Sequence, residues 1–194
     1  MNPSTIDGIL QSWCDSEPLR TYTGKLVKPL ALEAQHIDIL DVAHGLSNLC
    51  RFNGHCRQFY SVAEHSVRVS NILPSHLQLW GLLHDAAEAY LVDLPRAVKT
   101  SRGLGELYRM AENRAMQTLV ARFGLEWPEP PEVKTADRVL LATEIRDLLS
   151  VGASTPDCEM PSALPERIEP WIPVVAREKF LLQYEMLTAQ AMSR

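Results

Sequence analysis

Cysteine is scarce in this sequence, with four residues among 194. Cys14, Cys50, Cys56 and Cys158 show neither the close pairs of a zinc knuckle nor the density of a secreted disulfide framework. Cys50 and Cys56 are close enough in sequence to form a pair, but reduced thiols near an ordinary core fit this scattered pattern better. We therefore predict reduced cysteines with no catalytic role.

Long apolar runs and an excess of positive charge are also missing. No apolar stretch approaches the ~20 residues that a transmembrane helix needs, and the N-terminus lacks a basic segment followed by an apolar one. The formal net charge of −5 disfavours a nucleic-acid polymer or an anionic membrane as the main partner. We expect a cytoplasmic protein with neither of these partners.

Apolar residues at helical spacing are what the sequence does contain. They recur with the period of a helix along most of the chain, and no run alternates as paired strands do. The sequence predicts an all-α fold, a compact helical bundle, in a single domain of residues 1–194, because a chain of this length encloses a substantial core. Prolines interrupt residues 151–173, which we expect to form an irregular connection, either a lid or a surface loop.

Capping signals place the helices of this bundle. Ser61 and Glu64 have the spacing of a capping box and predict a helix that stops before Pro74. Ser75 caps the next expected helix, and His84 lies in its later half together with the aspartate that follows it. The predicted helical ranges are 61–73, a segment beginning at 75, 103–123, a segment beginning at 131 or 132, and 174–192.

Two histidines and two aspartates predict a four-ligand metal site, formed by His65, His84, Asp85 and Asp137. Asp137 lies on a helical stripe where an apolar residue is expected, and a buried unpaired charge is so unfavourable that a metal partner explains it better. Since no thiolate is offered, imidazole and carboxylate ligands suit a divalent ion such as Zn, Co, Mn, Fe or Ni. The expected chemistry is metal-assisted hydrolysis.

The order of these ligands resembles that of the HD-domain phosphohydrolases, whose signature is a histidine, an adjacent His-Asp pair and a distant aspartate. Within that superfamily the chain is most similar to the nucleotidase branch, which includes bacterial 5'-deoxynucleotidases and phage triphosphohydrolases that act on dATP. The similarity runs from about residue 38 to residue 149. Its stretches are Arg51-Phe52, Ser61-Val62-Ala63-Glu64-His65-Ser66, Leu83-His84-Asp85-Ala86-Ala87-Glu88, Asp93-Leu94-Pro95 and Val98-Lys99.

The resemblance implies roles for two acidic residues after the His-Asp pair. Glu88 is expected to orient the attacking water or to contact a second metal ion, and it lies one turn beyond Asp85 on the same side of the expected helix. The alternative for Glu88 is a solvated helical carboxylate. Asp93 is expected to contact the sugar and to favour deoxyribose, and it also fits a helix N-cap before Pro95.

Further residues are expected to contact the substrate. Arg51 and Lys99 are the cations that we expect on phosphate oxygens, although either also fits a surface position. Phe52 stands where the similar deoxynucleotidases often carry tryptophan, so it either stacks on the sugar or base or belongs to the core. His55 contacts phosphate or only satisfies a loop, and Glu144 either supports a metal ligand or forms a salt bridge.

The predicted protein is a divalent-metal-dependent hydrolase that removes the 5' phosphate or triphosphate from deoxynucleotides, with dATP a favoured substrate. The resemblance also implies a homo-oligomer. One alternative is an HD hydrolase of a signalling nucleotide such as ppGpp, since the further histidines expected for cyclic dinucleotides are missing. Another is a nucleotide-binding sensor without turnover, against which the complete ligand set and Glu88 argue.

Overall fold

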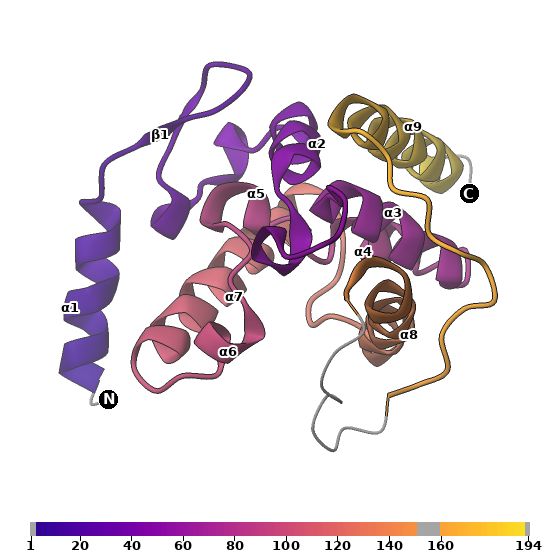
Figure 1. Cartoon of the computed structure of the whole chain (residues 1–194). Helices are drawn as coiled ribbons and strands as arrows, with labels where there is room; N and C mark the ends of the chain where they lie inside the picture. Colours follow the sequence, from indigo (N-terminus) through magenta and orange to yellow (C-terminus); the bar gives the residue numbers. More distant parts are fainter. Residues whose placement is uncertain (1–2, 151–159, 193–194) are drawn as a thin grey trace. The chain divides into compact units, whose positions relative to one another are not determined.

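The computed structural model describes residues 3–150 and 160–192 (Figure 1). Helices dominate these residues, which confirms the predicted all-α class. The chain divides into two compact units. Unit 1 contains Met1–Gly45 and Ala86–Trp127, and unit 2 contains Leu46–Asp85 and Pro128–Arg194. The single domain expected from the sequence stays a prediction.

Unit 1 combines short elements with one long helix. In chain order it contains α1 (Pro3–Cys14), β1 (Leu19–Arg20), β2 (Leu26–Val27), the 3-10 helices η1 (Pro29–Ala31) and η2 (Ala34–His36), most of α2 (Ile39–Asn48), α5 (Glu88–Leu91), α6 (Arg96–Lys99) and α7 (Leu104–Arg122). The two short strands pair antiparallel. α7 contacts α6, η1 and η2, and it buries Ala111, Ala115 and Leu119. The apolar face predicted over 103–123 therefore belongs to the core of unit 1.

Unit 2 is a cluster of helices around α3. It contains the end of α2, then η3 (Arg51–Gly54), α3 (Val62–Ile72), α4 (Gln78–Leu83), α8 (Pro131–Leu148) and α9 (Pro173–Met192). α3 packs against α4, α8 and α9 (Figure 1). Residues 62–67 of α3 are all buried. The polar side chains among them therefore need partners inside the unit.

The start of α3 follows the predicted capping pattern. Ser61 is the N-cap residue, and its hydroxyl accepts a hydrogen bond from the Glu64 amide at 3.1 Å. The helix ends at Ile72, two residues ahead of Pro74, which cannot continue it. This confirms the predicted helix and places the residue after Glu64, a predicted metal ligand, in its first turn.

A glycine allows α4 to lie close to α3. A Cβ added at Gly81 would lie 2.4 Å from Leu73 Cδ1 and 2.9 Å from Ser70 Cα. Any larger residue at this position would push the two helices apart. Because His84 directly follows α4, this close approach also sets how far His84 lies from α3.

The helix predicted around His84 and Asp85 is interrupted, so that prediction is wrong. α4 and α5 are two separate short helices, and both residues lie in the turn between them. His84 Nδ1 donates to the Gly81 carbonyl at 2.8 Å, the carbonyl that a continuing helix would pair with the Asp85 amide. The Ala89 and Tyr90 amides, which follow the break, bond three residues back rather than four. The helix is thus interrupted where the His84 side chain takes the place of a backbone amide on the Gly81 carbonyl.

The irregular connection predicted over 151–173 falls partly outside the described residues. Residues 151–159 lie outside them, and residues 160–172 contain neither helix nor strand. Arg68 and Trp171 anchor this stretch to α3, because the Arg68 guanidinium lies 4.9 Å from the Trp171 ring centroid and the Trp171 amide donates to Glu64 at 2.7 Å. The segment is therefore fixed to α3 at its end.

Three of the cysteines are free thiols, as predicted, and Cys158 lies outside the described residues. Burial raises the pKa of the Cys56 thiol to about 11, so this thiol stays protonated at neutral pH. Of the helices described in 3–150 and 160–192, none combines the length and the hydropathy that crossing a bilayer requires.

Candidate metal centre

The two predicted ligand histidines face each other in unit 2. His65 lies in the first turn of α3 and is fully buried, while His84 directly follows α4. Their Nε2 atoms are 3.3 Å apart. Two nitrogen ligands ~2.0–2.1 Å from one tetrahedral ion would be separated by about 3.3–3.4 Å. The observed separation therefore matches two ligands of a single ion.

The predicted aspartates bring oxygen atoms to the same two nitrogens. Asp85 Oδ2 lies 3.2 Å from His84 Nε2 and 3.6 Å from His65 Nε2. Asp137 Oδ1, from α8, lies 3.2 Å from His65 Nε2. The ligand atoms of His65, His84 and Asp137 all lie within 4.8 Å of one another. The structure thus brings all four predicted ligands together, although the Asp137 side chain is 38% exposed rather than buried as expected.

A bond from Nδ1 orients each imidazole ring. His65 Nδ1 lies 2.7 Å from Glu144 Oε1, and both side chains are fully buried. His84 Nδ1 donates to the Gly81 carbonyl. When each neutral ring carries its proton on Nδ1, both Nε2 lone pairs point into the cluster. Two lone pairs at this separation repel each other, so the arrangement needs a cation or a proton between them.

Arg51 and Glu144 support the cluster from the side of α8. Arg51 Nη2 donates to Glu144 Oε2 at 3.0 Å, and Arg51 Nη1 lies 3.7 Å from Asp85 Oδ2. The carboxylates of Asp85, Asp137 and Glu144 therefore outnumber the one guanidinium by two negative charges when the imidazoles are neutral. A divalent cation would offset this charge. Glu144 thus contacts the predicted ligand His65 and also forms a salt bridge, the two kinds of contact that the sequence left open.

Phe52 and His55 lie beside Arg51, in and just after η3. The Arg51 guanidinium carbon is 5.4 Å from the Phe52 ring centroid. Phe52 is half-buried and has a φ of 53°, a left-handed conformation that is uncommon for a bulky residue and tends to occur at functional sites. His55 is exposed. The substrate contacts expected of Arg51, Phe52 and His55 stay predictions.

The remaining predicted site residues belong to unit 1. Glu88 is the first residue of α5 and only 4% exposed, so it is not a solvated carboxylate. Its Oε1 accepts a hydrogen bond from Lys99 Nζ at 3.0 Å. Asp93 is half-buried between α5 and α6, and the N-cap residue of α6 is Pro95, so the capping role considered for Asp93 is wrong. The contacts expected of Asp93 with sugar and of Lys99 with phosphate stay predictions.

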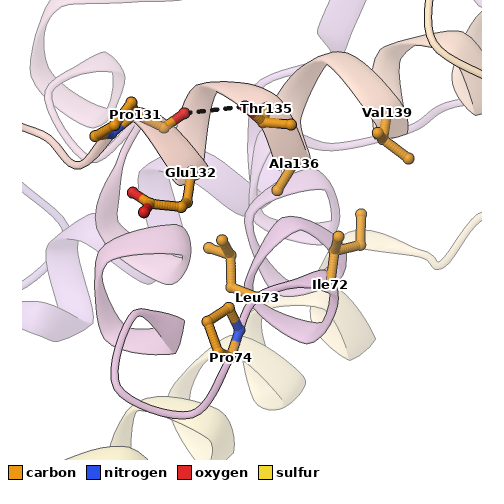
Figure 2. Close-up of a pocket in the computed structure, with 8 residues that line it drawn as sticks. All are labelled: Ile72, Leu73, Pro74, Pro131, Glu132, Thr135, Ala136 and Val139. Atoms are coloured by element: carbon orange, nitrogen blue, oxygen red, sulfur yellow. Dashed lines mark hydrogen bonds between the residues drawn. The ribbon is translucent and has the colours of Figure 1, made fainter.

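A hollow of about 460 Å³ lies on unit 2 between the end of α3 and the first turns of α8 (Figure 2). In the figure Leu73 and Ile72 face Ala136 and Val139, and the Glu132 carboxylate lies at one end. The described residues that line this hollow include none of the four predicted ligands. The hollow is therefore separate from the ligand cluster.

Two curated proteins resemble this chain in sequence. Over 130 residues it is 40% identical to the uncharacterized protein YfdR of Escherichia coli K12, and the match covers 67% of this chain and 71% of YfdR. The chain belongs to the YfdR family. It is also 35% identical over 126 residues to an uncharacterized protein of Rhodobacter capsulatus, with 60% of this chain and 63% of that protein covered. No family model matches the chain.

Neither YfdR nor the second relative has a name that states an activity. The predicted membership of this YfdR-family chain in the HD-domain phosphohydrolases therefore stays a prediction. The convergence of His65, His84 and Asp137 is seen in the structure of this chain itself.

Some residues of the centre in this YfdR-family chain were missed by sequence reasoning. The Gly81 carbonyl orients His84, and a backbone acceptor leaves no trace in side-chain pattern. Glu129 precedes α8, and burial raises the pKa of its carboxyl while His84 and Lys134 lower it in part. Only a proline-rich turn marks its position in the sequence, and such turns are common.

Protons bind the centre of this YfdR-family protein when no metal does. Burial alone would lower the pKa of the His84 imidazole, but the Asp85 carboxylate outweighs it and raises the pKa to about 10. Burial and Arg51 likewise oppose the charged form of His65, yet Glu144 and Asp137 raise its pKa. At neutral pH the metal-free centre is therefore protonated, and a metal must displace those protons.

Metal affinity is expected to rise steeply with pH. Because the pKa of His84 is raised, its proton stabilises the metal-free fold fully below about pH 6.5, and this stabilisation is lost as the pH rises through about 10. The proton therefore competes less strongly with the metal as the pH rises across this window. We expect about a tenfold gain in apparent affinity per pH unit for each proton displaced. Calorimetric titration of the metal in buffers of different ionisation enthalpy measures both quantities, and a flat pH response with no proton release contradicts the assignment.

Glu144→Gln is expected to weaken metal binding by about 10- to 100-fold, because Glu144 orients His65 and increases the basicity of its ring. Competition with a chromophoric chelator measures this affinity. Glu132→Gln is the matched control, since Glu132 is exposed on the first turn of the same helix. Equal metal affinity in the two variants would show that Glu144 only fills space beside Arg51.

Proposed function

We propose that this YfdR-family chain is a divalent-metal-dependent phosphohydrolase that removes the 5' phosphate or triphosphate from deoxynucleotides in the cytoplasm, with dATP a favoured substrate. The observation that carries the proposal is the pair of Nε2 atoms of His65 and His84, 3.3 Å apart with each Nδ1 bonded elsewhere. The resemblance to the nucleotidase branch of the HD-domain phosphohydrolases supports the substrate class.

The residues of the cluster fit a divalent ion in donor type, spacing and charge. His65, His84, Asp85 and Asp137 would hold it, and Zn, Co, Mn, Fe and Ni are the candidates. When bound, such an ion lowers the pKa of a water molecule and stabilises negative charge on a phosphoryl oxygen. Asp137 is the partly exposed member of this ligand set, so water can reach its carboxylate.

The other residues of the proposed site hold the cluster or meet the substrate. Glu144 fixes the ring of His65, and Arg51 bridges Glu144 to Asp85 while its side chain is 12% exposed. Arg51, Phe52 and His55 are the proposed substrate contacts within unit 2. The contact of Asp93 with the sugar is proposed from the family resemblance alone. The water-orienting role of Glu88 and a homo-oligomeric assembly belong to the proposal on the basis of the family resemblance.

The test begins with metal-free protein loaded in turn with each candidate ion. Each form is incubated with a panel of ribo- and deoxynucleoside mono- and triphosphates and with ppGpp, and the released anion is identified by ion chromatography. We expect phosphate or triphosphate from deoxynucleotides and little product from the matching ribonucleotides. The ratio of the two rates measures the predicted discrimination at the 2' position.

Other outcomes of this panel select the alternatives. Release of pyrophosphate from ppGpp, with deoxynucleotides unchanged, would replace the proposed substrate by a signalling nucleotide. Micromolar nucleotide binding with no product for any ion would show a sensor rather than an enzyme.

A further inference from the structure

A lysine joins two carboxylates in unit 1. Lys99 Nζ donates to Glu88 Oε1 at 3.0 Å and to Glu112 Oε1 at 2.8 Å. The three residues come from α6, α5 and α7. Glu88 is 4% exposed as a residue, and the side chains of Lys99 and Glu112 are each 24% exposed. The pairs are therefore largely shielded from solvent.

The Lys99 ammonium is held in place by more than these two ion pairs. Its Nζ lies 5.5 Å from the centroid of the Tyr108 ring, and the Arg109 guanidinium donates to the Lys99 carbonyl. At Gly105 a Cβ would lie 2.4 Å from that same carbonyl, so α7 begins in direct contact with the end of α6. Burial alone would lower the pKa of the ammonium, but Glu88 and Glu112 raise it above its ordinary value. Lys99 is thus a charged side chain in one fixed position.

These contacts compete with the phosphate contact expected of Lys99 from the sequence. An ammonium has three donors, and two of them point at carboxylates here. Moving it to a phosphate would leave the buried Glu88 without this counter-ion, which is unfavourable.

We propose that Glu112 and Lys99 are positioning residues for Glu88, with Glu112 holding the ammonium and the ammonium holding the Glu88 carboxylate. The inference rests on the proposed function, in which Glu88 orients the attacking water. It adds Glu112, which no sequence motif marks, and gives Lys99 a role in the rate of the reaction instead of in substrate affinity.

The test compares kcat and KM of the metal-loaded full chain with those of three variants. Glu112→Gln is expected to lower kcat by about tenfold, and Lys99→Met by about a hundredfold. Neither fall in kcat exceeds the fall expected when a general base is removed. KM for the best substrate of the panel and the metal content should stay within about twofold of those of the wild type in both variants. Lys99→Arg should recover most of the rate, because a guanidinium can also bridge two carboxylates.

Glu106→Gln is the matched control, since Glu106 is exposed on the first turns of the same helix as Glu112. Its kcat should equal that of the wild type. Thermal unfolding of every variant separates a loss of fold from a loss of rate, and if Lys99→Met unfolds, Glu112→Gln and Lys99→Arg decide the question.

The outcomes separate the inference from the proposed function. A raised KM with unchanged kcat in Lys99→Met would restore the phosphate contact and overturn the positioning role. A wild-type rate in folded Glu112→Gln would overturn it as well, while the hydrolase itself stands. If the wild-type protein turns over no nucleotide, the proposed function fails and the positioning role fails with it.

Discussion

We expect the substitution His65→Ala to abolish both metal binding and turnover. The substitution deletes the Nε2 atom that lies 3.2 to 3.6 Å from atoms of the other three ligands, and it takes the imidazole partner away from the buried Glu144. A bound ion contributes several kcal/mol to such a reaction, so we expect kcat to fall by about a thousandfold or more. Elemental analysis of the purified variant and its rate on the best substrate measure both losses.

His76→Ala serves as the matched control, because His76 is exposed on unit 2 in the connection before α4. It should keep the metal content and the rate of the wild type. Asp85→Ala is expected to behave like His65→Ala, since Asp85 Oδ2 approaches both imidazoles. A folded His65→Ala protein that retains its ion and its rate would remove the basis of the metal centre.

Glu88→Gln is expected to keep the metal and lose most of the rate. The amide has the size of the carboxylate and its oxygen still accepts the hydrogen bond from Lys99, but it cannot accept a proton from water. Loss of a general base lowers kcat by about 10²- to 10⁴-fold. Steady-state kinetics and metal analysis of the same preparation give the two numbers.

Glu126→Gln provides the comparison for this variant, because Glu126 is an exposed glutamate of unit 1. It should match the wild type in both measurements. An unchanged kcat in Glu88→Gln would show that Glu88 serves only the ion pair with Lys99. Loss of the metal would instead make Glu88 part of the ligand set.

The starts of α3, α7, α8 and α9 follow from the sequence because helix formation depends on neighbours three and four residues apart. α3 begins directly after the predicted cap Ser61, α8 begins at Pro131, and α7 differs from the predicted range 103–123 by one residue at each end. Two predictions differ from the structure: α4 begins at Gln78 with Leu77 rather than Ser75 as its N-cap, and the helix is interrupted at His84. There the side chain bonds the Gly81 carbonyl, and apolar periodicity carries no information about such a bond.

In the candidate site, too, some features can be predicted from the sequence and others cannot. The four ligand residues and their donor atoms are marked in the sequence by residue type and order. The partners of the charged residues are not: Arg51 and Glu144 are 93 residues apart, and Lys99 and Glu112 are 13 residues apart on different helices. The sequence predicts phosphate contacts for both cations, and the ion pairs that the structure shows between each of them and two carboxylates could not be foreseen from it.

By itself the sequence of this YfdR-family chain determines that it is helical, where the helices α3, α7, α8 and α9 begin, and that imidazole and carboxylate donors are available to a metal ion. Only the tertiary structure decides that four of these donors converge within a few ångströms, that Glu144 orients His65, and that Lys99 is bound by Glu88 and Glu112. The reason is physical: helix formation is governed by residues adjacent in the chain, whereas ion pairing depends on distances that packing sets between distant segments.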